Sequence, residues 1–204
     1  MPKVSSAPVA GAPGRTPTLE VYSPTAKFFH WLTVALILVQ LPLGLFMAWY
    51  ARKTEFAAPS DQLFDTHKLI GFTILIVIVA RLAYRLMAGA PSPEPTIEPW
   101  QRTVSAINHW SMYGMLLVTP FLGWLGTSYY GAMEPFGIKL PSLVAAPAND
   151  EIKAANEKFS ETIFEWHEAA ALILLALVTV HISAALYHRF GRKDNVLRRM
   201  LPGS

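Results

Sequence analysis

The stretch from Trp166 to His188, WHEAAALILLALVTVHISAALYH, constrains the fold of this chain more than any other feature. It places an uncharged run of twelve residues between two histidines, His167 and His181, which are fourteen positions apart. A helix turns about 100° and rises about 1.5 Å per residue, so fourteen residues return to nearly the same face after about 21 Å. We therefore expect a long apolar helix that presents two histidines on one face at two depths.

The composition indicates a membrane protein. The chain has 204 residues, of which 52% are hydrophobic and 15% are charged, whereas soluble domains carry about 25% charged residues. Cysteine is absent, which excludes disulfides and thiolate metal sites. Four segments reach the roughly 20 residues of apolar helix that cross a bilayer. The expected fold is an all-α integral membrane protein, a bundle of four transmembrane helices near residues 27–49, 66–87, 105–129 and 164–187.

The chain is expected to have three parts. Residues 1–24 are predicted to be a disordered N-terminal tail, because the first 26 residues contain five prolines and no long apolar run. Residues 25–190 form the four-helix membrane domain, and residues 191–204 form a basic C-terminal tail. Apolar residues recur at helical spacing over 152–163, which predicts a short amphipathic helix on the outer surface before the last transmembrane helix.

Charge predicts the orientation of the bundle. The two tails and the connection between the second and third helices lie on one side of a four-helix bundle. With the ends of the helices included, that side carries 11 of the 17 Lys and Arg residues and 4 of the 14 Asp and Glu residues. Positively charged segments remain in the cytoplasm, so both termini are expected to be cytoplasmic.

A second pair of residues repeats the spacing of the first. His67 and Arg81 are also fourteen positions apart, on the second helix, which runs in the same direction as the fourth. This places His67 at the depth of His167, and Arg81 near the depth of His181. His30, at the cytoplasmic start of the first helix, lies at the depth of Arg81 and His181. We call this depth, on the cytoplasmic side, the inner level.

The inner level has two further candidates. His109 begins the third helix on the cytoplasmic side, and His188 ends the fourth helix on the same side. By geometry alone, either could replace His30 or His181 as a ligand.

Two histidines facing each other, without cysteine, favour haem over zinc. Structural zinc needs four ligands, whereas a haem iron needs only two axial imidazoles, because the porphyrin fills its other positions. Arg81 has two interpretations: it binds a haem propionate, or it marks the cytoplasmic end of its helix. Small residues lie three or four positions after the histidines, where a flat ligand could pack: Gly71, Ala170, Ala171, Ala184 and Ala185. Gly114, Gly123 and Gly126 are interpreted as sites of close helix packing.

Several stretches resemble the bacterial four-helix di-haem cytochrome b561 family. They are FHW, HKLIG, ARLAYRL, NHWSMYGMLL and WHEAAALILLALVTVHISAALYHRFGRKDNVLRRMLP, and the resemblance covers Thr25 to Pro202. In that family, helices one, two and four supply the axial ligands. The resemblance therefore implies two haem b groups: a cytoplasmic haem between His30 and His181, and a periplasmic haem between His67 and His167.

The resemblance implies a function in the bacterial inner membrane. We expect transmembrane electron transfer through two b-type haems, to or from the quinone pool, and most specifically superoxide:ubiquinone oxidoreductase activity. One alternative is a di-haem cytochrome subunit that couples a dehydrogenase or hydrogenase to quinone. A rival from another class is a haem-free transporter or proton relay. Expected partners are the quinone pool, membrane lipid and superoxide or another periplasmic donor; no nucleic acid is expected.

His188 is the candidate catalytic residue for ubiquinone reduction. It lies seven positions after His181, on the same helix face and roughly 10 Å further along. Histidine titrates near neutral pH, so it can donate a hydrogen bond to a quinone carbonyl and deliver a proton. The alternative is that His188 faces lipid headgroups and that the basic residues beside it only enforce the topology; these are Arg189, Arg192 and Lys193.

Overall fold

The computed structural model describes residues 20–55 and 58–203, and this part of the chain is helical with no strand. Residues 1–19 of the predicted tail lie outside it. Three short helical segments accompany the long ones: a 3-10 turn (η1, Pro135–Gly137), a π-helix (η2, Tyr187–Arg192) and a second 3-10 turn (η3, Arg198–Met200). The long helices are α1 (Pro24–Thr54), α2 (Ser60–Ala88), α3 (Pro99–Tyr130) and α4 (Asp150–Leu186).

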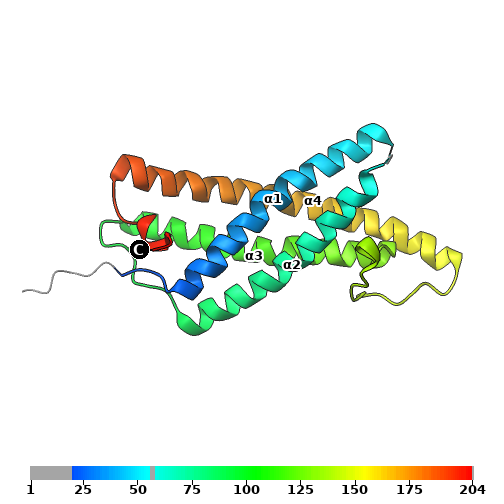
Figure 1. Ribbon diagram of the computed structural model, residues 1–204, viewed down its shortest axis with the longest axis horizontal. Helices are drawn as coiled ribbons and strands as arrows, with labels where there is room; N and C mark the ends of the chain where they lie inside the picture. Colours follow the sequence, from blue (N-terminus) through cyan, green and yellow to red (C-terminus); the bar gives the residue numbers. More distant parts are fainter. Residues whose placement is uncertain (1–19, 56–57, 204) are drawn as a thin grey trace, which may run out of the picture.

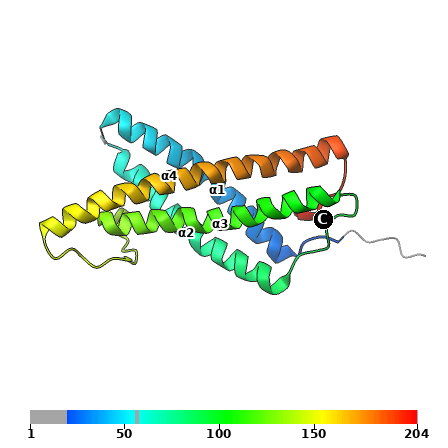
Figure 2. The ribbon, with the colours of Figure 1, turned by 180° about the vertical axis from the view of Figure 1, so that it is seen from behind.

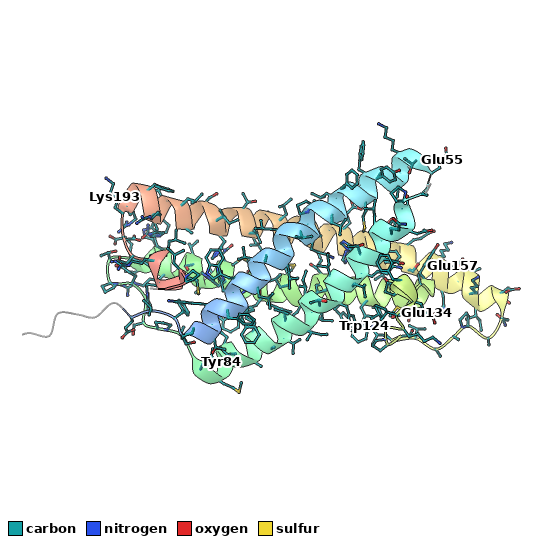
Figure 3. All side chains as sticks on the ribbon, viewed as in Figure 1. Glu55, Tyr84, Trp124, Glu134, Glu157 and Lys193 are labelled. Atoms are coloured by element: carbon teal, nitrogen blue, oxygen red, sulfur yellow. The ribbon has the colours of Figure 1, made fainter. Side chains whose placement is uncertain are left out.

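The long helices form two hairpins that cross each other. α1 packs along α2, α3 packs along α4, and the two layers meet chiefly where α2 contacts α3. Figure 2 shows the same crossing from behind. The start of α1, the α2–α3 connection and the C-terminus lie together at one end of the bundle, which we call the termini side (Figure 1). The opposite end, with the α1–α2 and α3–α4 connections, is the loop side. In Figure 3, Tyr84 and Lys193 mark the termini side, and Glu55, Glu134 and Glu157 mark the loop side.

Three of the long helices are sufficiently long and apolar to cross a membrane. These are α1, α2 and the continuous segment from α4 through η2. Many of their large apolar side chains are exposed, among them Leu38, Ile76 and Leu172, as expected for surfaces in contact with lipid. The all-helical fold is therefore confirmed. α3 is a fourth helix of 32 residues, and its span across the bilayer stays a prediction.

The last long helix begins earlier than predicted. α4 is continuous from Asp150, where the Asn149 side chain accepts a hydrogen bond from the Ile152 amide at 2.8 Å. The expected amphipathic segment is thus the first part of α4 and not a separate surface helix. The physical reason is that no Gly or Pro interrupts residues 150–186. With 37 residues, α4 is about 55 Å long and exceeds the roughly 30 Å apolar thickness of a bilayer.

A small apolar core separates the two predicted histidine levels. Each long helix contributes to it, and on α2 and α4 a core residue lies midway between the two candidate site residues. For example, Leu174 lies seven residues from both His167 and His181. Burial there keeps water out of the middle of the bundle and fixes the rotation of each helix. The core residues are Ile37, Ile74, Ile78, Leu116 and Leu174.

Candidate functional site

The loop-side level brings together His67 of α2 and His167 of α4. Their ring centroids are 6.0 Å apart and their planes lie at 86°. His167 donates its Nδ1–H to the backbone carbonyl of Thr119 at 2.8 Å, which leaves Nε2 free to bind a metal. Such a second hydrogen bond fixes the orientation of metal-binding histidines. His67 Nδ1 is buried and has no hydrogen-bond partner in the described part of the protein.

Glycines make room for both rings at this level. A Cβ atom on Gly44 of α1 would lie 3.0 Å from His67 Cε1, and one on Gly123 of α3 would lie 3.1 Å from His167 Cε1. Both distances are shorter than an ordinary carbon–carbon contact. The predicted packing role of Gly123 is therefore specific, because it accommodates a candidate ligand.

A polar residue not identified from the sequence lies beside His67. Gln40 of α1 is 9% exposed, and its Nε2 donates to the His67 backbone carbonyl at 3.0 Å. Its Oε1 is buried without a partner among the described residues. Gly71 admits this side chain, because a Cβ atom there would lie 3.2 Å from Gln40 Nε2. Its position as an uncharged polar residue in the middle of an apolar run is the sequence signal that could have identified Gln40.

The termini-side level holds three histidines around one arginine. The rings of His30 and His181 are 6.3 Å apart between centroids, and those of His109 and His181 are 5.1 Å apart. Arg81 donates from Nη2 to His30 Nδ1 at 3.0 Å and lies 5.4 Å from the Tyr113 ring centroid. Of the five candidates for the inner level, His30, Arg81, His109 and His181 are thus close together, on four different helices.

His109 is held differently from the other two histidines. Its Nδ1–H donates to the backbone carbonyl of Ser105, one turn earlier in α3, at 2.6 Å. Its ring is also closer to His181 than two imidazoles on one iron would be. An imidazole nitrogen binds a metal at about 2 Å, and its ring centre lies about 1 Å further, so two axial rings have centroids about 6 Å apart. The spacing of His30 and His181 suits this arrangement better.

The spacing of α4 from the other hairpin also suits a flat group. Within the described residues, α4 packs closely along α3 but not in this way along α1 or α2. Directly packed helices have axes about 8–10 Å apart. Within each pair, the two histidines therefore face each other from helices that lie further apart than directly packed helices do. The residues present fit two haems.

His188 lies beyond the termini-side level, in the π-helix η2. Its Nδ1–H donates to Asp194 Oδ2 at 2.6 Å, and the side chains of His188 and Asp194 are 12% and 6% exposed. Arg192 Nε lies 3.5 Å from the same oxygen. His188 thus directs its Nδ1 at a buried carboxylate. Asp194 was not identified from the sequence, although a single acidic residue within a basic tail was a visible signal.

A helical membrane bundle with two pairs of facing histidines defines a class of protein: a membrane cytochrome, which holds haem between its helices for electron transfer. Comparison with known families agrees. Residues 21–203 match the family described as prokaryotic cytochrome b561, and the chain belongs to that family. Membership implies a b-type haem and favours membrane electron transfer over the rival haem-free transporter.

Individual relatives cover nearly the whole chain. Cytochrome b561 homolog 1 of Escherichia coli K12 is 28% identical over 184 residues, which are 89% of this chain and 97% of the relative. Cytochrome b561 homolog 2 of the same strain is 28% identical over 193 residues, with 91% and 94% covered. A probable superoxide oxidase, CybB of Yersinia pestis, is 24% identical over 181 residues, with 85% and 91% covered.

Proposed function

We propose that this protein carries electrons across the bacterial inner membrane through two b-type haems. His67 and His167 hold the haem on the loop side, and His30 and His181 hold the haem on the termini side. The supporting observation is the matched pair of histidine spacings, 6.0 and 6.3 Å, at two levels of one bundle. When bound, each haem would supply a reversible one-electron carrier, held by the two histidine side chains of its level.

Arg81 serves the termini-side haem in this proposal. In the structure its guanidinium donates to His30 Nδ1. A histidine that binds iron through Nε2 keeps its proton on Nδ1 and cannot accept that hydrogen bond. Arg81 then needs another acceptor, and its planar fork matches a carboxylate such as a haem propionate. Its position beside His30 favours this role over that of a helix-end marker.

We infer that both termini are cytoplasmic and that quinone is reduced on the termini side. His188 is the candidate catalytic residue there: its Nδ1–H is donated to Asp194, so Nε2 is left to contact a quinone carbonyl. The electron donor approaches from the loop side. The name of the relative CybB supports superoxide as that donor, which makes superoxide:ubiquinone oxidoreductase the most specific form of the proposal.

A second candidate is a cytochrome subunit that docks a dehydrogenase or hydrogenase on the loop side. It is favoured by exposed apolar side chains in the α3–α4 connection, at Phe136, Ile138 and Leu143. This connection is anchored to α2, because the Phe136 amide donates to Asp65 Oδ2 at 3.0 Å. It therefore presents a fixed surface to a partner.

The test is superoxide-driven reduction of a short-chain ubiquinone by the purified haem-loaded protein, followed by quinone absorbance. We expect reduction without any partner protein, and its loss when superoxide dismutase removes the donor. Haems that ubiquinone reoxidises normally, but that superoxide does not reduce, would favour the subunit. Haems that ubiquinone does not reoxidise would contradict both candidates.

A further inference from the structure

The carboxylate beside His188 is held in place from several directions. Asp194 Oδ1 accepts from the Val196 amide at 3.1 Å, while Oδ2 accepts from His188 at 2.6 Å and lies 3.5 Å from Arg192 Nε. Arg192 is itself fixed, because its Nη2 donates to the Thr96 carbonyl at 2.7 Å. Asp194 is therefore held beside His188 by a backbone amide and by the Arg192 side chain, in addition to its contact with His188 itself.

The local helix geometry contributes to this contact. α4 ends at Leu186 and continues as the π-helix η2, after which Lys193 adopts a left-handed conformation with φ of 56°. The chain then turns back so that the Asp194 amide donates to the His188 carbonyl at 3.2 Å. This reversal returns Asp194 to the ring of His188. π-Helical turns are often found at functional sites.

We propose that Asp194 is the positioning residue for His188 in quinone reduction. This inference rests on the proposed function, which puts the quinone carbonyl at His188 Nε2. Asp194 accepts the Nδ1–H of His188, which fixes the rotation of the ring and leaves Nε2 to face the quinone carbonyl. A buried carboxylate plays this role for histidine in other proton-transfer sites.

One electron arrives from the proposed electron path as the Nε2–H bond of His188 breaks and an O–H bond forms on the quinone oxygen that it contacts; the second electron follows by the same path, and water supplies the proton for the second oxygen. The imidazole is left neutral, with its Nδ1–H still donated to Asp194. Water on the termini side then returns a proton to Nε2. Without the carboxylate, the ring would be free to rotate, and its Nε2–H would point at the quinone oxygen in fewer molecules.

The test is stopped-flow reoxidation of the reduced haem-loaded protein over a range of short-chain ubiquinone concentrations. Asp194→Asn keeps the shape of the side chain and removes its charge. We expect the maximal rate to fall roughly tenfold or more, by analogy with losing a general acid, with little change in the half-saturating concentration. Asp194→Glu, which restores the carboxylate, should recover much of the rate. Asp65→Asn is the matched control, because Asp65 is also a partly buried, hydrogen-bonded carboxylate but lies on the loop side, where it accepts from the Phe136 amide.

Two further measurements separate a positioning role from a structural one. In a double-mutant cycle, adding Asp194→Asn to His188→Phe should cause no further slowing, because Asp194 acts through His188. In the dithionite-reduced wild type, ¹⁵N NMR of labelled histidine should show His188 protonated at Nδ1. Asp194→Asn should change that signal, which is assigned by its disappearance in His188→Phe.

The outcomes distinguish this inference from the proposed function. If His188→Phe is reoxidised normally, the quinone lies elsewhere and both fail. If His188→Phe is slow but Asp194→Asn is normal, only the positioning role is overturned. It is also overturned if the two effects multiply, if Asp194→Asn changes only the half-saturating concentration or loses haem, or if His188 Nδ1 carries no proton.

Discussion

At the loop-side level, each histidine ring packs against a glycine of a neighbouring helix. Gly123 on α3 is the clearest case, because any Cβ atom there would crowd the His167 ring. The ring is also fixed by its hydrogen bond to Thr119, so it cannot move away without losing that bond. Gly123 therefore helps to set the orientation of His167, although it does not itself bind the haem.

Gly123→Val should selectively weaken the loop-side haem. The added side chain displaces the His167 ring, and disturbing the support of a metal ligand typically costs about 10–100-fold in affinity. The measurement is haem retained after purification. Gly114→Val on the same helix is the control, because a Cβ atom at Gly114 meets nothing within 4 Å. Equal haem loss in both variants would contradict a specific role for Gly123.

Arg81→Leu should lower the midpoint potential of the termini-side haem. A buried positive charge near an iron favours the reduced form, and at an effective dielectric constant of about 20 its removal costs on the order of 1 kcal/mol or more. A potentiometric titration measures both haems in one experiment. The loop-side haem acts as an internal control and should keep its potential. Two unchanged potentials would reduce Arg81 to an anchor at the helix end.

At the scale of the helices, α4 is the element on which both candidate haems depend. His167 and His181 share a face only because their separation is close to four whole turns. Helix α4 has no Gly or Pro that could break this phase. The rotation of α4 therefore sets both sites at once.

Inserting one alanine after Leu174 should remove one haem. The insertion turns His181 about 100° away from His30 while the loop-side half keeps its packing. The same insertion between Ala145 and Ala146, in the exposed α3–α4 connection, should leave both haems bound. Haem content per chain is the measurement. Two haems in the Leu174 variant would show that the shared face is not required.

The periodicity of the sequence predicted the helices and the depth of their histidines, because helix geometry is local. It could not predict contacts set by chain reversals. Asp194 reaches His188 only through the π-helix and the left-handed Lys193. Gln40 reaches His67 only because α1 packs on α2 and Gly71 of α2 leaves room for the Gln40 side chain. The continuity of α4 was missed because the amphipathic pattern was interpreted as a separate helix, although no Gly or Pro interrupts residues 150–186.

At the scale of the whole molecule, hydrogen bonds from the C-terminal tail close the termini side of the bundle. On the termini side, buried Arg199 connects the C-terminal tail to the segment before α1 and to the α2–α3 connection. It donates to the Glu20 carbonyl at 2.6 Å and to the Ser92 carbonyl at 2.5 Å. Trp31 adds a hydrogen bond to the Met200 carbonyl at 2.9 Å. The basic tail therefore helps to close the proposed quinone side, in addition to carrying the charge that predicts its orientation.

The predicted orientation can be mapped with single cysteines, because the natural sequence contains none. Gly203→Cys marks the termini side and Ala146→Cys marks the loop side. In intact spheroplasts, a membrane-impermeant thiol reagent should label Ala146→Cys and should label Gly203→Cys only after the membrane is opened. The reverse pattern would place the termini in the periplasm and the proposed quinone site on the wrong side.

The central claim is that one chain holds two b-type haems, one at each histidine level. Haem per chain in the purified protein, measured as the pyridine haemochrome against protein concentration, tests it most directly. We predict two haems in the natural protein and one in each of His167→Ala and His181→Ala, from the loop side and the termini side respectively. One haem in the natural protein, or two in either variant, would contradict the claim.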